Sequence, residues 1–236
     1  MCTVSFVANA NGVIITSNRD EKKLRLPALP PKEFVDGNVH LMYPVDGHAG
    51  GTWFIIKNDG AVGILLNGAI AAHAPKSNYR ISRGKILPEI FLQKNPLVAL
   101  QNFDLSNVEN CTILIYYNNQ LHACRWNGEQ LFVEALSINQ AHIFSSVTLY
   151  NNSMIEEREN WFSSWLADNL EPTQQDCIAF HENGGKGNDH YGLQMNRENA
   201  LLTVSVTSVK IKDNNAILFY KDCVANTTTT QQMVLN

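Results

Sequence analysis

The sequence has little of what marks several protein classes. Only 17% of its 236 residues are charged, and 18 Lys+Arg against 22 Asp+Glu leave a net charge of −4. A nucleic-acid or anionic-membrane surface requires clustered positive charge, so this balance argues against both kinds of partner. No apolar run approaches the roughly 18 residues needed to span a bilayer. We therefore expect neither a nucleic-acid-binding protein nor an integral membrane protein.

Cysteine is also scarce. The five cysteines are an odd number, widely scattered and without a C-x-x-C pair: Cys2, Cys111, Cys124, Cys177 and Cys223. Neither a disulfide framework nor a zinc site follows from this pattern, and the seven histidines show no paired ligand spacing. We expect no metal and no cofactor. The segment from Met1 to Asn18 lacks the basic start and apolar stretch of a secretory signal, which favours a cytoplasmic location.

What the sequence does contain predicts one α+β domain over residues 1–236. Hydrophobic residues make up 44%, enough for a sizeable core at this length. Short runs rich in β-branched and aromatic residues, separated by Asn, Asp and Gly, predict strands. These strands are Thr3–Ala8, Val13–Ser17, Trp53–Lys57, Ala61–Leu66, Thr112–Tyr117, Leu121–Trp126, Gln130–Leu136, His142–Val147, Leu201–Ile211 and Ala216–Tyr220. The polar tail, about residues 225–236, is expected to be frayed.

Helical periodicity is confined to the middle of the chain. Ser153 with Glu156 predicts a capping box, and apolar residues at helical spacing predict a helix over Met154–Ala167. Thr173 with Asp176 predicts a second cap, with a helix over Thr173–His181. A third helix lies between Ser82 and Gln93, and Pro88 places its start near Leu87. We expect these helices to cover antiparallel sheets.

The most informative region is the N-terminal hairpin. Cys2 follows Met1, and a residue as small as Cys permits removal of an initiator methionine. The chain would then begin with a thiol and a free α-amine on one carbon. Because that amine has an ordinary pKa of roughly 7.7–8.0, part of it is a neutral base at neutral pH. A thiol beside its own base is an activated nucleophile.

The hairpin register decides what lies beside Cys2. With Asn11-Gly12 as a two-residue loop, Cys2 lies opposite Glu21; with a three-residue loop, it lies opposite Asp20. Either register brings Asn18-Arg19-Asp20-Glu21 beside Cys2, where an arginine lowers a thiol pKa and a carboxylate orients an amine. The alternative is that Cys2 is a packing residue and that the four polar residues form a solvated turn.

At these residues the chain resembles a known family. Met1-Cys2-Thr3 followed by Ser17-Asn18-Arg19-Asp20-Glu21 resembles the NRDE family, which is transport and Golgi organisation protein 2-like and is named after the last four residues. Gly50-Gly51-Thr52-Trp53, Leu66-Asn67 and Ser82-Arg83-Gly84 agree with it. The family is similar to an outlying branch of the N-terminal nucleophile (Ntn) hydrolases, close in layout to choloylglycine hydrolases and penicillin V acylases. This resemblance implies a four-layer αββα sandwich of two antiparallel sheets.

The resemblance also implies roles for single residues. In such acylases an N-terminal cysteine attacks a linear amide, which makes Cys2 the nucleophile and Arg19 and Asp20 its tuning pair. Asn67 and Asn151 are the candidates for stabilising the tetrahedral oxyanion; the ordinary alternatives are a turn and a helix approach. The implied binding residues are Asn18 and Glu21 beside the nucleophile, Trp53 for an acyl group and Arg83 for an anionic ligand.

Two function classes follow. The first is a cysteine amidohydrolase acting on a linear carbon–nitrogen bond of a small acyl amide. The second is a non-catalytic binding or trafficking protein for haem or lipid and acyl ligands on a hydrolase-like scaffold, because members of the resembled family have been linked to such roles. A fold alone does not decide between them, since function resides in the site.

Overall fold

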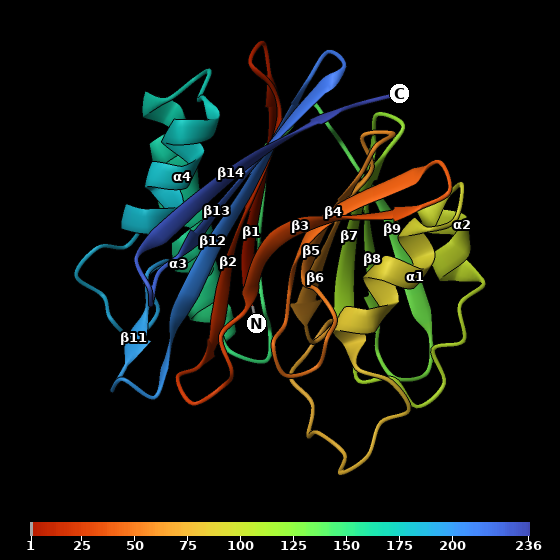
Figure 1. Ribbon diagram of the computed structural model, residues 1–236. Coiled ribbons are helices and arrows are strands. Elements are labelled where there is room, and N and C mark those ends of the chain that lie inside the picture. The colour runs from red at the N-terminus through yellow and green to blue at the C-terminus, as the bar shows by residue number, and fades with distance from the viewer. Residues whose placement is uncertain (1) are drawn as a thin grey trace. The chain divides into compact units, whose positions relative to one another are not determined.

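The computed structural model describes the backbone of residues 2–236 and the side chains from Thr3 onward. Contacts divide this part of the chain into two compact units (Figure 1). Unit 1 combines the N-terminal residues up to Arg25 with Asn139–Val234, and unit 2 combines Leu26–Ile138 with Leu235–Asn236. Each unit is built on a seven-stranded sheet whose described pairs are antiparallel. The expected α+β class with two antiparallel sheets is therefore confirmed.

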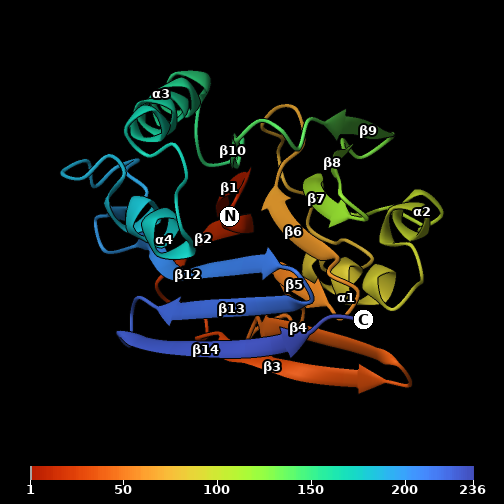
Figure 2. The ribbon, with the colours of Figure 1, turned by 90° about the horizontal axis from the view of Figure 1, so that it is seen from above.

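The sheet of unit 1 joins the two ends of the chain. Its strand order is β10-β1-β2-β12-β13-β14, with β11 paired to β12. The strands are β1 (Cys2–Asn9), β2 (Gly12–Lys22), β10 (His142–Ser145), β11 (Asn196–Arg197), β12 (Leu201–Lys212), β13 (Asn215–Asp222) and β14 (Thr227–Val234). Two helices, α3 (Asn152–Asp168) and α4 (Gln174–Asn183), cover one face of this sheet (Figure 2).

An apolar core joins these helices to the sheet. Val7 of β1 and Ile14 of β2 pack against Phe162 of α3 and Phe180 of α4. Side chains alternate between the two faces of a strand, so every second residue of β1 and β2 contributes to this layer. Toward the chain's N-terminus the same layer becomes polar, with Thr3 and Ser5 buried in place of aliphatic residues.

The sheet of unit 2 comes from one continuous stretch of chain. Its order is β3-β4-β5-β6-β7-β8-β9. The strands are β3 (Leu29–Asp36), β4 (Val39–Val45), β5 (Phe54–Lys57), β6 (Val62–Asn67), β7 (Cys111–Tyr117), β8 (Gln120–Trp126) and β9 (Leu131–Leu136). The short helix η1 (Arg83–Lys85) leads into α1 (Ile86–Phe91), which packs on β5 and β6, while α2 (Pro96–Gln101) packs on β7.

The N-terminal hairpin turns one residue earlier than the sequence suggested. Asn9 pairs with Gly12, so Ala10 and Asn11 form the turn and Cys2 lies opposite Arg19, not Glu21 or Asp20. Gly12 itself belongs to β2, with φ of +112°. A Cβ there would meet the carbonyl oxygen of Ile211 at 2.2 Å, so the neighbouring strand β12 requires glycine at this position. Both expected registers were wrong because they placed this glycine in the turn.

The C-terminal segment is a strand and not a frayed tail. β14 pairs with β13 from Asn215 opposite Val234 to Asp222 opposite Thr227. Its threonines are β-branched and therefore favour extended backbone despite their polarity. As the last strand in the order of its sheet, β14 exposes many of its residues, which explains its polar composition.

All three predicted helices are present, but the N-cap of one differs. Thr173 and Asp176 form the expected capping box at the start of α4. The N-cap of α3 is Asn151, whose side chain accepts from the backbone N–H of Met154, so the expected box at Ser153 was wrong. Strands β3 and β4 and helix α2 were missed. Among the described residues, no helix is both long enough and apolar enough to cross a membrane.

Candidate functional site

The candidate site is built around the end of the β1–β2 hairpin. The backbone of Cys2 lies directly opposite that of Arg19, and Thr3 lies opposite Asn18. The side chain of Cys2 lies outside the described residues. The four residues Asn18 to Glu21 nevertheless belong to a paired strand, with β12 on their other side. The alternative of a solvated turn is therefore excluded for this segment.

Arg19 and Asp20 lie on opposite faces of β2. The Arg19 guanidinium is 3.8 Å from the Glu21 carboxylate, which also lies 3.5 Å from Arg25. Asn18 and Asp20 instead make their bonds in the layer that contains α3 and α4. Successive residues of a strand alternate in this way. The two members of the expected tuning pair therefore do not contact each other.

The face that carries Arg19 is unusually polar for a buried surface. Arg19 is only 4% exposed, with Ser205 of β12 directly opposite it; Ser17 lies two residues before Arg19, with Thr207 opposite. We call these four residues the polar strip. Within the described part of the chain, the hydroxyl oxygens of Ser17 and Thr207 are buried without a hydrogen-bond partner. Such groups are uncommon in protein interiors and suit a ligand or a water.

The opposite face holds the carboxylate of Asp20. This residue is completely buried. The hydroxyl of Tyr150 donates to Oδ2 at 2.7 Å, and the hydroxyl of Thr203 donates to Oδ1 at 2.7 Å. Burial raises the pKa of Asp20, whereas the charge of Arg158 and the two hydroxyl donors act to lower it. The short O–H···O distances are typical of bonds to a carboxylate.

Arg158 of α3 is the buried positive charge that acts electrostatically on this carboxylate. It is completely buried, and its guanidinium lies 3.6 Å from the centre of the Tyr150 ring. It donates to the carbonyl oxygens of Tyr191 (2.9 Å) and Gly192 (3.0 Å). It also donates to the hydroxyl of Thr3, the residue after Cys2. Arg158 was not among the residues predicted from the sequence, although a charged residue four positions before Phe162 interrupts an apolar helix face.

A third buried group, His181 of α4, joins the same layer. Asn18 donates both amide hydrogens, to the carbonyls of His181 (2.9 Å) and Leu193 (2.6 Å), so its Oδ1 must accept from His181 Nδ1 at 2.7 Å. Nε2 is then the acceptor for the hydroxyl of Ser5 at 2.8 Å. Burial, assisted by the charge of Arg158, lowers the pKa of His181 to about 3, which keeps the ring neutral. Asn18 therefore positions His181, and its donors are used within the protein.

The remaining predicted residues are tied to their own surroundings. Asn151 caps α3 and is exposed, with its Oδ1 accepting from Met154 N–H at 3.0 Å. In unit 2, Asn67 ends β6, and Trp53 is 4% exposed just before β5. Arg83 pairs with the Glu109 carboxylate at 3.0 Å and donates to the Asn110 carbonyl at 2.9 Å. The roles predicted for Asn67, Trp53 and Arg83 remain predictions.

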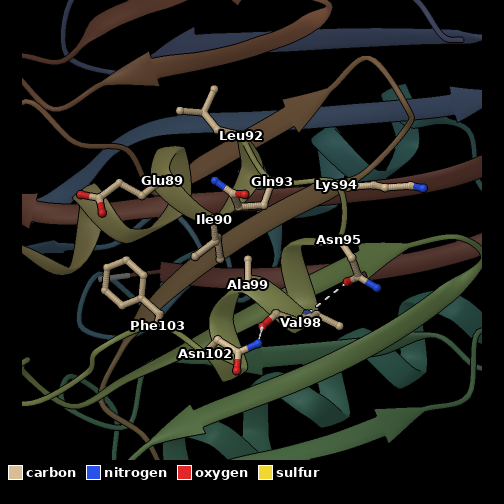
Figure 3. Close-up of a pocket in the computed structure, with 10 residues that line it drawn as sticks. All are labelled: Glu89, Ile90, Leu92, Gln93, Lys94, Asn95, Val98, Ala99, Asn102 and Phe103. Atoms are coloured by element: carbon tan, nitrogen blue, oxygen red, sulfur yellow. Dashed lines mark hydrogen bonds between the residues drawn. The ribbon is translucent and has the colours of Figure 1, made fainter.

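Two hollows lie away from the predicted residues. One, of about 710 Å³, lies in unit 2 between α1 and α2, where Asn95 caps α2 and Ile90 and Phe103 contribute apolar walls (Figure 3). The other, of about 430 Å³, lies in unit 1 between α3 and α4 and is lined by Trp161, Trp165 and Phe180. In residues 3–236, no three His, Cys, Asp or Glu side chains are placed to hold a metal ion.

The architecture matches solved enzymes at low sequence identity. A Caenorhabditis elegans N-acylethanolamine-hydrolyzing acid amidase ortholog aligns with a TM-score of 0.63 and 12% identity, over 89% of this chain and 92% of that chain. A mutant of the conjugated bile acid hydrolase of Clostridium perfringens aligns with a TM-score of 0.58 and 10% identity, over 99% and 92%. A second variant of that hydrolase aligns with a TM-score of 0.53 and 10% identity, over 98% of this chain and 92% of that chain.

These likenesses identify the fold as that of the Ntn hydrolases. The chain belongs to the Transport and Golgi organisation 2 family, whose profile matches residues 1–213. The resemblance stated from the Asn18-Arg19-Asp20-Glu21 signature is thereby confirmed. No curated protein sequence shows significant similarity to the chain.

Proposed function

We propose that the chain is an N-terminal-cysteine amidohydrolase that acts on the linear amide of a small acyl or lipid-like conjugate. The observation that carries the proposal is the register of the hairpin, because it sets Cys2 directly opposite the buried Arg19. A positive charge beside a thiol favours the thiolate, the reactive form of cysteine. The Ntn-hydrolase fold supports the same interpretation, as a scaffold on which N-terminal nucleophiles act.

The proposed reaction has two steps. After removal of Met1, the Cys2 sulfur attacks the amide carbonyl, and its α-amine takes the thiol proton and returns it to the leaving nitrogen as the C–N bond breaks. Water then attacks the resulting thioester, the C–S bond breaks, and a carboxylic acid and the free thiol are released. The net change is one amide and one water converted to one acid and one amine.

Arg19, Asn67 and Asp20 have separate roles in this proposal. Arg19 stabilises the thiolate, and Asn67 is the proposed donor to the tetrahedral oxyanion. Asp20 acts from the other face of β2, through the packing of the hairpin. Asn151 is a second proposed donor to the oxyanion, because the bond that caps α3 uses its side-chain oxygen and not its amide hydrogens. Trp53 and Arg83 remain the proposed contacts for the acyl group and for an anionic group of the substrate.

The proposed substrate class is taken from the chemistry of the two structurally similar enzymes. The two similar enzymes are an N-acylethanolamine-hydrolyzing acid amidase ortholog and a conjugated bile acid hydrolase, and an N-acylethanolamine is an acyl amide. The polar strip offers two buried hydroxyls without a described partner, which suit polar atoms of such a substrate or its attacking water. We further propose a cytoplasmic location, since the four described cysteines are free thiols.

The test combines mass, labelling and turnover. Intact mass of the native protein should show loss of Met1, and iodoacetamide near neutral pH should label Cys2 before the other cysteines. N-Palmitoylethanolamine and a glycine-conjugated bile acid serve as amide probes. Cys2→Ala should abolish hydrolysis of whichever amide the wild type cleaves, while Cys223→Ala leaves it unchanged.

Arginine variants provide the matched control. Arg19→Gln should slow Cys2 labelling on the order of tenfold, because it removes the adjacent charge. Arg25→Gln removes the other arginine near Glu21 and should change labelling by less than about twofold. Retention of Met1, or equal labelling of Cys2 and Cys223 in the processed chain, would sink the nucleophile mechanism and favour a binding protein.

A further inference from the structure

A buried arginine whose described contacts include no carboxylate needs a physical explanation. All described contacts of the Arg158 guanidinium are with neutral groups: two carbonyls, the hydroxyls of Thr3 and Ser145, and the ring of Tyr150. Transfer of such a cation out of water is strongly unfavourable, and an apolar residue of similar volume often gives equal or better stability. A role in general packing therefore does not account for a charge here.

The contacts of Arg158 converge on the start of the chain. Thr3 of β1 and Ser145 of β10 lie directly opposite each other, and the same guanidinium nitrogen donates to both hydroxyls, at 3.4 Å for Ser145. Thr3 is the residue after Cys2. The guanidinium therefore joins α3 to the two strands at the end of the sheet where Cys2 is located.

The second connection runs to the next strand. The Tyr150 ring lies against the Arg158 guanidinium, and the Tyr150 hydroxyl donates to Asp20 of β2. The electrostatic attraction between Arg158 and Asp20 offsets part of the penalty of burying each charge. Arg158 thus contacts β1 and β10 directly and β2 through one tyrosine.

We propose that Arg158 is a positioning residue for the N-terminal cysteine. It holds Thr3, the residue after Cys2, in place by a direct hydrogen bond, and it holds the Asp20 carboxylate of the neighbouring strand through Tyr150. This inference rests on the proposed function and adds a residue to it. Displacement of a nucleophile by about 1 Å can lower a rate on the order of 100-fold. Arg158 does not touch the reacting atoms; it acts through Thr3 and Tyr150.

The experiment compares three variants with one control in the processed full-length chain. Arg158→Met removes the charge, Thr3→Val removes only the hydroxyl that Arg158 contacts, and Tyr150→Phe removes only the donor to Asp20. Arg197→Met is the control, because Arg197 also lies over the Tyr150 ring, at 5.6 Å, but bonds to the carbonyls of His190 and Leu149. Thr3→Val and Tyr150→Phe keep the proposal testable if Arg158→Met does not fold.

The readouts are the pH profile of Cys2 alkylation and the hydrogen exchange of the first amides of β1. Arg158→Met and Thr3→Val should increase the rate of that hydrogen exchange on the order of tenfold. Tyr150→Phe should shift the pH midpoint of Cys2 alkylation. The Arg197→Met control should leave the exchange rate and the alkylation rate within about twofold of the wild type. Where the wild type cleaves an amide, Arg158→Met should lower kcat on the order of 100-fold with KM changed less than about threefold.

The two proposals fail in different ways. Absence of amide cleavage by the wild type would count against the proposed function, while the exchange and alkylation readouts would still test Arg158. If the variants lower only the melting temperature, with exchange at β1 and the alkylation profile unchanged, Arg158 is an ordinary packing residue and the inference is wrong.

Discussion

The hydroxyl of Tyr150 lies 2.7 Å from Oδ2 of Asp20, and this bond links residues 130 positions apart in the chain. It connects the residue just before the N-cap of α3 to the second strand of the N-terminal hairpin. Both groups are buried, so neither can exchange its partner for water at no free-energy cost. The relationship makes Asp20 of the Asn18–Glu21 segment part of the interior of unit 1.

The stability of the protein should fall in mild acid because of His181. The folded-state pKa of about 3 lies below the ordinary 6.5, so between these values the unfolded chain binds a proton that the folded chain does not. Stability from this group is therefore complete above about pH 6.5 and falls by about 1.4 kcal/mol per pH unit on acidification toward about pH 3. Urea unfolding at several pH values measures the slope.

A glutamine substitution at this histidine should remove that slope. His181→Gln retains hydrogen-bonding atoms but cannot titrate. The free energy of unfolding of His181→Gln should therefore depend less steeply on pH, between about 6 and 4, than that of the wild type. His48→Gln, at an exposed position, is the control and should retain the wild-type slope. Equal slopes in all three proteins would contradict the assignment of a neutral buried ring.

Removing a hydroxyl from the polar strip should change the free energy of unfolding in the opposite direction from removing one on the other face of the sheet. Thr207→Val removes a buried hydroxyl without a described partner and should raise the free energy of unfolding by about 1 kcal/mol. Thr16→Val removes a hydroxyl that is 2.9 Å from Ser208 Oγ and should lower it by about 1 kcal/mol. Chemical denaturation measures both; a loss of stability in Thr207→Val would indicate that an ordered water or another group already satisfies this hydroxyl.

The C-terminal strand should contribute to stability at its buried positions. Met233 is 6% exposed and Val234 is 73% exposed, although they are neighbours on β14. Met233→Ala should lower the free energy of unfolding by about 2–3 kcal/mol, because it leaves a cavity. Val234→Ala should change it by less than about 0.5 kcal/mol. Equal small effects of the two substitutions would mean that the strand is not docked in solution.

The described cysteines should be unreactive in the native protein. Burial raises the pKa of Cys111, Cys124 and Cys177 to about 12 and that of Cys223 to about 11. Thiolate is therefore rare near neutral pH, and these residues should label with iodoacetamide only slowly, whereas all should label in urea. Rapid native labelling of Cys111 or Cys177 would contradict the burial of these side chains.

Short sequence patterns correctly predicted those features that are determined by a few neighbouring residues. Short patterns predicted the capping box of Thr173 and Asp176 and the strands with alternating or continuous apolar residues. They also predicted that the Asn18–Glu21 segment lies beside Cys2. The resemblance carried by that segment also led to the fold. Such features need no knowledge of distant contacts, because the residues that determine them are neighbours in sequence.

The failures have a common physical cause. The register of the hairpin depends on Gly12, and the contact that requires glycine there is the carbonyl of Ile211, which lies near the other end of the chain. Asp20 and Arg158 are likewise connected through a third residue, Tyr150, which lies in the loop just before α3. The tail becomes a strand because β13, a separate segment, supplies the hydrogen bonds that its extended threonines need.

The division of the sheets along the chain has a consequence for synthesis on the ribosome. All strands of the unit 2 sheet lie between Leu29 and Leu136, so that sheet is complete while the C-terminal strands are still unmade. In contrast, the edge of β2 that faces away from β1 pairs with Leu201–Ile211, which are synthesised much later. At roughly 5–20 residues per second, the hairpin that carries Cys2 waits about 10–40 seconds for its neighbour. During that interval the edge of β2 that will pair with β12 has no strand beside it, and pairing with β12 closes the sheet only afterwards.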